Sequence, residues 1–329
     1  MRIGDISITP ALALAPMEGV TDLTFRRLIR QVGGCGLYVT EFIAAKNLTR
    51  NIPMALRAAM FDPDEHPISV QVYGREPALM ADAARYVADL GADIVDLNMG
   101  CPSKKVCNGS GGSALMKDPK LAQQIVAAMR GAVSIPYTVK MRSGWDVDHK
   151  NAPEMAHMCE AEGVDAVTVH WRTREDGYKG VRELDTIARI VDERSIPVFA
   201  NGDIIDVRSA LETLNQTGAA GLMIGRGAIR DPWVFHRIVA AQQGRPQIEV
   251  TPDEKERVLL AYYDAMRSTF HSDQAALGRM KKIARYFTGG LEDGAVLRQA
   301  IFHSQTIDEA YARVGSYFEN LRTLETIGG

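Results

Sequence analysis

The sequence predicts an α/β protein, a (β/α)8 (TIM) barrel followed by an all-helical C-terminal domain. Three observations support this fold: short apolar runs alternate with helical patterns, polar residues stand where those runs end, and no strand pattern follows about residue 250. Unbroken apolar runs are typical of parallel strands covered by helices. Eight βα units within about 215 residues favour a barrel, and a doubly wound sheet is the weaker alternative.

The predicted strands are short, and each is followed by a helical pattern. In chain order they are Leu12–Ala15, Leu37–Thr40, Ile68–Tyr73, Ile94–Asn98, Tyr137–Met141, Ala166–His170, Val198–Asn201 and Gly221–Gly225. Between them, apolar residues recur at helical spacing, as in Pro77–Ala88 and in the segment that follows Asp118 and Pro119.

The pattern changes near Gly244, and we place a boundary between domains 1–243 and 244–329 there. Thr251–Glu254 and Thr306–Glu309 both match a capping box, which predicts that a helix starts at each. Helices are also expected over Asp273–Phe287 and Gly294–Phe302.

The composition is that of a globular protein. The chain has 329 residues, is 46% hydrophobic and 24% charged, and carries a formal net charge of −3, so disorder and a disulfide scaffold are disfavoured. No apolar run approaches the roughly 18 residues that cross a membrane, and no signal-peptide pattern is present. We therefore expect a cytoplasmic protein without membrane contact.

The four cysteines form no C-x-x-C pair, and no H-E-x-x-H motif occurs. We expect free thiols and no structural metal. The slight excess of acidic residues gives no general reason to expect nucleic-acid binding, so such a function would need a local basic surface.

Polar or special residues stand at the C-terminal ends of most predicted strands. In a barrel these ends share the rim that carries the active site. The residues are Pro16, Met17, Thr40, Glu41, Gln71, Asn98, Lys140, His170, Asn201, Gly225 and Arg226.

The loops after the seventh and eighth strands predict a phosphate site. They contain Asn201-Gly202-Asp203 and Gly225-Arg226-Gly227. Glycine lets backbone N–H groups approach a phosphate, and Arg226 adds a charge-assisted contact. Two ordinary glycine turns are the alternative. Because no G-x-G-x-x-G follows a strand, a mononucleotide such as FMN is favoured over a tightly held dinucleotide.

Lys140 ends an apolar strand, where a cation needs an anionic partner. Reduced flavin supplies such a charge, and a salt bridge to Glu41 or another acid is the alternative. Gln71 is a candidate hydrogen-bond partner for the amide-like edge of the flavin, or else a satisfied rim glutamine. His170 shares the rim, which favours a cofactor contact over a core histidine.

Cys101 opens a loop with glycines at positions 109, 111 and 112, which permits loop movement. A thiol with a suitable pKa donates a proton, and closure of the loop would carry Cys101 over a substrate. A buried structural cysteine and a disulfide to Cys107 are the alternatives.

Together these residues resemble the tRNA-dihydrouridine synthase family, most closely its bacterial B-type branch, over roughly residues 10–240. The matching motifs are Ala15–Asp22 (APMEGVTD), Asn98–Pro102 (NMGCP), Gly112–Leu115 (GSAL), Lys140–Trp145 (KMRSGW), His170–Arg174 (HWRTR), Asn201–Asp203 (NGD) and Met223–Gly227 (MIGRG). Two positions depart from the family pattern: Glu18 replaces a small residue, and Trp171 replaces glycine.

The resemblance implies that NADPH (or NADH) reduces FMN, that a hydride then passes to C6 of a tRNA uridine, and that Cys101 protonates C5. Asn98 would lie beside the uracil. FMN would be held by Pro16, Met17, Glu18, Gln71, Lys140, His170, Asn201, Gly202, Asp203, Gly225 and Arg226.

The target base must leave the folded RNA, at a cost of a few kcal/mol that other tRNA contacts must offset. The candidate contacts are the basic residues Lys104, Lys105, Arg172, Arg174, Arg279, Lys281, Lys282 and Arg285. The last four also fit the solvated face of a helix whose apolar side is Leu277, Met280, Ile283, Ala284 and Phe287.

Two other functions remain open on the sequence. One is an FMN barrel reductase of the dihydroorotate dehydrogenase type, acting on a small molecule, which would not need a basic helical tail. The other is an RNA-binding protein without catalytic activity.

Overall fold

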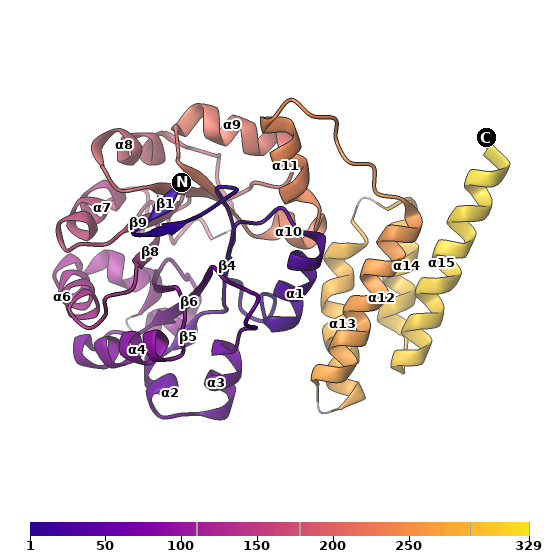
Figure 1. The fold of residues 1–329 in the computed structure, drawn as a ribbon, viewed down its shortest axis with the longest axis horizontal. Helices are drawn as coiled ribbons and strands as arrows, with labels where there is room; N and C mark the ends of the chain where they lie inside the picture. Colours follow the sequence, from indigo (N-terminus) through magenta and orange to yellow (C-terminus); the bar gives the residue numbers. More distant parts are fainter. Residues whose placement is uncertain (110, 178, 271, 290, 329) are drawn as a thin grey trace. The chain divides into compact units, whose positions relative to one another are not determined.

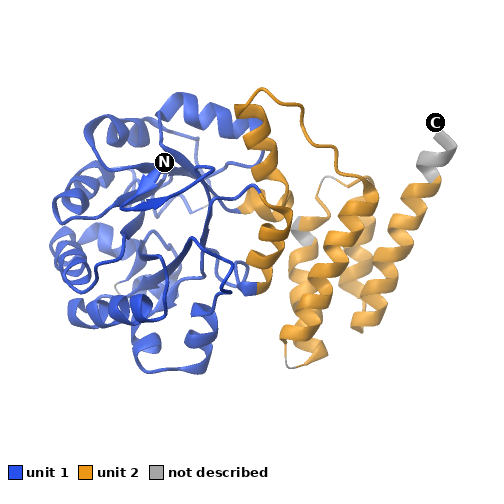
Figure 2. Cartoon of the chain, in the orientation of Figure 1, with its two compact units in different colours: residues 1–23, 34–225 blue, residues 24–33, 226–329 orange. Residues whose placement is uncertain are grey.

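The computed structural model describes residues 1–109, 111–177, 179–270, 272–289 and 291–328, except for the side chains of residues 285, 286 and 324–328. The chain forms two compact units (Figure 2). Unit 1 comprises Met1–Leu23 and Gly34–Gly225, and unit 2 comprises Thr24–Gly33 and Arg226–Gly329. The division into a cofactor-binding domain (1–243) and an RNA-binding domain (244–329) stays a prediction, because packing alone does not say what each part binds.

Unit 1 is a closed barrel of eight parallel strands, which confirms the predicted fold class. Each barrel strand pairs in parallel with the next one along the chain, including the second with the third. The last strand pairs with the first, and this pairing closes the barrel. All eight predicted strands are present. They are β3 (Leu12–Leu14), β4 (Leu37–Val39), β6 (Ile68–Tyr73), β7 (Ile94–Met99), β8 (Tyr137–Arg142), β9 (Ala166–His170), β10 (Val198–Asn201) and β11 (Gly221–Ile224).

Helices surround the strands of unit 1 (Figure 1), so the strands are buried on both faces and their sequences lack polar–apolar alternation. The helices after the third to seventh barrel strands are α4 (Pro77–Asp89), α6 (Pro119–Arg130), α7 (Ala152–Ala161), α8 (Asp185–Glu193) and α9 (Val207–Thr217). Shorter helices lie in the connections: α2 (Ala45–Thr49), α3 (Pro53–Ala59), α5 (Lys104–Asn108) and the 3-10 helix η1 (Gly112–Lys117).

Three two-residue strands were not predicted, because they are too short to show a hydrophobic period. β5 (Ile43–Ala44) pairs with β6, and β1 (Arg2–Ile3) pairs with β2 (Ile6–Ser7) as an antiparallel hairpin. Ile3 and Ile8 are buried in one cluster with the first residues of several barrel strands, such as Ile94. The hairpin therefore closes the N-terminal end of the barrel and leaves the opposite end for the site.

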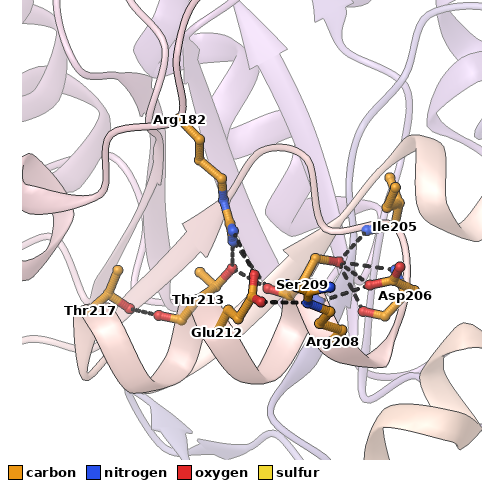
Figure 3. Close-up of polar contacts among 8 residues, drawn as sticks. All are labelled: Arg182, Ile205, Asp206, Arg208, Ser209, Glu212, Thr213 and Thr217. Carbon is orange, nitrogen blue, oxygen red and sulfur yellow. Dashed lines mark hydrogen bonds and ion pairs between the residues drawn. The ribbon is translucent and has the colours of Figure 1, made fainter.

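Helix α9 begins with a capping box that the sequence analysis did not identify (Figure 3). The Asp206 carboxylate accepts from the Ser209 backbone N–H at 2.8 Å, and the Ser209 hydroxyl accepts from the Asp206 N–H at 3.1 Å. Arg182, from the loop between β9 and α8, donates to the Ser209 carbonyl at 3.1 Å and to the Thr213 hydroxyl. These bonds fix the start of α9 just after the loop that carries Asn201–Asp203.

In unit 2, the described elements are helices. They are α1 (Leu23–Val32), α10 (Arg226–Arg230), α11 (Val234–Gln242), α12 (Pro252–Thr269), α13 (Asp273–Phe287), α14 (Gly294–His303) and α15 (Ile307–Gly328). The Phe25 ring of α1 meets the Tyr262 ring of α12 edge to face, with 6.1 Å between centroids. His236 Nε2 lies 2.6 Å from the Val32 carbonyl. Among the described helices, none has the length and hydropathy needed to span a membrane.

The predicted starts of α12 and α15 are confirmed, but each capping box is only half formed. The Thr251 hydroxyl accepts from the Glu254 N–H at 3.2 Å, whereas the Glu254 carboxylate pairs with Arg257. At α15 the Thr306 hydroxyl accepts from the Glu309 N–H at 3.1 Å, and the Glu309 carboxylate accepts from the N–H of residue 305. Competing donors near each glutamate explain the difference.

Replacing Asp206 with Ala should lower the free energy of unfolding by about 1 kcal/mol, because the first turn of α9 loses its side-chain acceptor. Urea unfolding measures this change. Arg208→Ala is the control, because it removes only a solvent-exposed pair with Glu212 and should change stability by less than about 0.5 kcal/mol. Equal effects of the two substitutions would contradict the capping role.

Candidate active site at the barrel rim

Predicted site residues converge at the C-terminal end of the barrel. Asn98 on β7 is the register partner of Lys140 on β8, and Asn201 on β10 is the register partner of His170 on β9. Gln71 lies on β6, next to β7. The expectation that these side chains share one rim therefore holds for the barrel strands.

A chain of hydrogen bonds crosses the barrel interior toward Cys101. Thr138 Oγ1 donates to Asp96 Oδ1 at 2.5 Å, and Gln71 Nε2 donates to Asp96 Oδ2 at 2.6 Å. Asn98 Nδ2 donates to Gln71 Oε1 at 2.7 Å, and Asn98 Oδ1 accepts from the Cys101 backbone N–H at 2.8 Å. Because Asp96, when ionised, only accepts, it sets the orientation of both amides in sequence.

Asp96 is a site residue that the sequence analysis missed. The available signal was an acid in an otherwise apolar strand, two positions before Asn98 and so on the same face of β7. Burial raises the pKa of Asp96 to about 6, while hydrogen bonds from Thr138 and Gln71 and the charge of Lys140 oppose the rise. The carboxylate is thus a buried charge with one side-chain donor to each of its oxygens.

Lys140 Nζ donates to Asn201 Oδ1 at 2.9 Å, and Asn201 Nδ2 donates to the Met223 carbonyl at 2.7 Å, which fixes the orientation of that amide. Burial, together with the nearby Arg142 charge, lowers the pKa of Lys140 to about 8, and the charge of Asp96 opposes this shift. At neutral pH the ammonium group keeps its charge and has donors beyond the one given to Asn201.

The backbone of Cys101 is held at both ends. Its N–H is bonded to Asn98, and its carbonyl accepts from the Ser113 N–H at 3.1 Å and the Ser113 hydroxyl at 2.9 Å. Burial raises the pKa of the thiol, so it is protonated at neutral pH. All four cysteines are free thiols. Movement of Cys101 with its loop stays a prediction, and it would have to break these bonds.

Gly202 is required by its surroundings. Its φ is +114°, and a Cβ there would lie 2.5 Å from Trp171 Cδ1 and 2.9 Å from His170 Cε1. Gly225 is less constrained, because a Cβ there would lie 3.4 Å from Met17 Sδ, an ordinary van der Waals distance. The predicted phosphate loops therefore carry little side-chain bulk at these two positions, as backbone approach to an anion demands.

Arg172 lies in a different environment from the one predicted. It is 4% exposed, donates to Asp203 Oδ2 at 2.5 Å and to the Lys179 carbonyl at 2.8 Å, and lies over the Trp171 ring at 4.0 Å. With its Nε and Nη2 bonded inside the loop, this guanidinium is not exposed on the surface where a ligand as large as RNA would bind, and only its buried Nη1 lacks a partner among the described residues. We therefore remove Arg172 from the predicted RNA contacts. The sequence could not reveal the pairing, because Asp203 is distant along the chain.

The other predicted residues are placed as follows. Glu18, Lys104 and Lys105 are exposed, and Pro16 and Met17 are partly exposed. Arg226 begins α10 in unit 2. On α13 the predicted apolar side is buried, Arg279 is partly exposed and Lys282 is exposed. The side chain of Arg285 lies outside the described residues.

The donors around Gly202 fit a phosphate-bearing cofactor. Trp171 Nε1 and Arg172 Nη1 are buried, and neither has a hydrogen-bond partner among the described residues. Lys140 adds an ammonium group on the same rim. Buried donors and a cation suit an anionic ligand, because an unpaired buried donor otherwise costs about 1–3 kcal/mol.

Asp96→Asn should change how stability depends on pH. The folded-state pKa of Asp96 is about 6, above its usual value, so the folded protein holds a proton that the unfolded chain has released between about pH 4 and 6. Between these pH values, the wild type should lose about 2 kcal/mol of unfolding free energy relative to the variant. Urea unfolding at both values measures the difference, and a pH-independent difference would contradict the raised pKa.

Comparison with known proteins gives a consistent family. The model of the family described as "Dihydrouridine synthase (Dus)" matches residues 13–322. The chain is 40% identical over 319 residues to "tRNA-dihydrouridine synthase B" of Pseudomonas syringae pv. tomato, covering 97% of this chain and 94% of the relative. It is 38% identical over 326 residues to the protein of the same name from Xanthomonas axonopodis pv. citri, covering 98% and 96%. The chain therefore belongs to the dihydrouridine synthase family.

Proposed function

We propose that this protein is a flavin-dependent tRNA-dihydrouridine synthase, which reduces the C5–C6 double bond of uridines in tRNA. Its family and the names of its relatives support the reaction and the RNA substrate. The structural observation that carries the proposal is the placement of Cys101, whose backbone is anchored through Asn98 on the rim that also presents Lys140 and whose thiol has a pKa raised by burial. A tRNA substrate also agrees with the cytoplasmic location predicted from the sequence.

FMN is the cofactor whose chemistry the rim fits. Lys140, His170, Asn201, Gly202 and Asp203 from unit 1 would hold it, with Pro16, Met17, Glu18, Gln71, Gly225 and Arg226 as further predicted contacts. When bound, FMN takes a hydride from NADPH (or NADH) and supplies one to C6 of the uracil. The Gln71 side chain already donates one N–H to Asp96 and accepts a hydrogen bond from Asn98. It could therefore offer the flavin one further N–H and one further lone pair on its oxygen.

Cys101 supplies the proton. Hydride addition at C6 leaves negative charge toward C5, and transfer of the thiol proton to C5 completes the single bond. The resulting thiolate regains a proton from solvent. Burial favours the neutral thiol before the reaction, and the positive charge of Lys140 favours the thiolate after it. Asn98 Oδ1 accepts from the Cys101 backbone N–H, and Asn98 is the proposed contact for the uracil.

The uridine must be flipped out of the RNA to reach the rim, and binding elsewhere must offset that cost. Lys104, Lys105 and Arg174 on unit 1, and Arg279, Lys282 and Arg285 on unit 2, are the proposed contacts. Because phosphate contacts release counterions, tRNA affinity should fall steeply with added salt.

Cys101→Ala should separate the two half-reactions. Reduction of the flavin by NADPH should survive, because the thiol takes no part in it, whereas reduction of tRNA should fall by about 10²-fold or more. Anaerobic stopped-flow absorbance follows the first step, and dihydrouridine formation in tRNA follows the second. Cys35→Ala is the control, because Cys35 bonds to the Leu12 and Leu37 carbonyls far from the rim. Equal loss of both steps in the Cys101 variant would overturn the assigned role.

Lys140→Ala should impair both steps and weaken flavin retention, because the variant loses a partly buried cation where the cofactor would bind. Flavin content after gel filtration and the rate of bleaching by NADPH measure this effect. Full flavin content with an unchanged bleaching rate would contradict the assignment. Reduction of a free pyrimidine but not of tRNA by the wild type would favour a small-molecule reductase instead.

A further inference from the structure

Two cations share one aromatic ring on unit 1. Lys117 Nζ lies 4.7 Å from the centroid of the Trp145 ring, and Arg174 Cζ also lies 4.7 Å from it. Lys117 ends η1, after β7, while Trp145 and Arg174 lie in the loops after β8 and β9. All three loops leave the C-terminal ends of barrel strands, so the group stands at the same end of the barrel as Cys101.

The backbone holds this group in place. The Arg174 N–H donates to the Gly144 carbonyl, and the Glu175 N–H donates to the Trp145 carbonyl, both at 3.0 Å. The Trp145 N–H donates to the His149 carbonyl, also at 3.0 Å. The first two bonds join the loop after β8 to the loop after β9, and the third lies within the loop after β8. Trp145 and Arg174 are therefore held next to each other by these backbone hydrogen bonds.

The positive charges of Lys117 and Arg174 have no carboxylate partner among the described residues. Neither side chain forms an ion pair or hydrogen bond with the part of the chain that the structure describes, and Arg174 Nε is a buried donor without an acceptor there. Nearby acids are engaged elsewhere: Asp118 caps α6, and Asp146 accepts from His149. Other arginines of unit 1 do pair with carboxylates, namely Arg130, Arg172, Arg182, Arg189, Arg194 and Arg208.

We propose that Lys117, Trp145 and Arg174 form a platform that binds the phosphate backbone of the RNA substrate. A cation over a ring face keeps its N–H groups available for phosphate oxygens, and the ring holds the cation without an anion. The exposed Lys104 and Lys105 extend positive charge along the same end of the barrel, which suits a polyanion better than a single phosphate group. The inference rests on the proposed function and adds Lys117 and Trp145 to its RNA contacts.

The test compares Lys117→Gln, Arg174→Gln and Trp145→Ala with the control Lys120→Gln, which removes an exposed lysine three residues along the chain. The Kd for unmodified tRNA is measured by filter binding at several salt concentrations, alongside the KM for NADPH in flavin reduction. Each platform variant should raise Kd about 5–10-fold, and the two variants that remove a cation, Lys117→Gln and Arg174→Gln, should also reduce the salt slope by about one. The control and the KM for NADPH should stay unchanged, and Arg174→Lys should recover most of the affinity because it keeps the charge.

The outcomes separate the platform from the function on which it rests. Wild-type Kd and salt slope in all three variants, with intact tRNA reduction, would overturn the platform and leave the proposed function standing. A raised KM for NADPH with unchanged tRNA affinity would overturn the assignment to RNA and point to the phosphates of the nicotinamide cofactor. A wild-type protein that neither binds nor reduces tRNA would overturn the proposed function itself.

Discussion

A buried carboxylate organises the centre of the barrel. Asp96 accepts hydrogen bonds from Thr138 and Gln71, and this forces the Gln71 oxygen toward Asn98 and the Asn98 oxygen toward the backbone of Cys101. In water, a side-chain amide can exchange the positions of its oxygen and nitrogen at little cost. In this series of hydrogen bonds it cannot, because the Asp96 carboxylate at one end only accepts hydrogen bonds. The direction of every donor on this side of the rim therefore follows from one charge.

On the other side of the rim, the arrangement depends on Gly202 and on the buried guanidinium of Arg172. Gly202 leaves room for His170 and Trp171, and Asp203 in the same loop pairs with Arg172. The Arg172 guanidinium lies over the Trp171 ring, 4.0 Å from its centroid. This stacking leaves the hydrogen bond between Lys140 and Asn201 in place.

The sequence predicts the barrel well because the signal is local. Buried parallel strands leave unbroken apolar runs, and all eight were located within a residue or two of their observed ends. Asn98, Lys140 and Asn201 stood out because polar residues at strand ends share a rim, and Cys101 stood out because it opens a loop with several glycines. Asp96 did not stand out, because it lies inside a strand and its partners come from β6 and β8. The burial of Arg172, the half-formed caps at Thr251 and Thr306, and the packing of α1 all depend on contacts distant in sequence, which no local pattern encodes.

Helix α1 belongs to unit 2 although it follows the first barrel strand. During synthesis, its Phe25 emerges early, while Tyr262, against which it packs, leaves the ribosome only after the whole barrel. Until then an apolar helix face on the nascent chain has no native cover. The two units are therefore interleaved along the polypeptide, and a single cut between the barrel strands and the last helices would separate α1 from its packing partners.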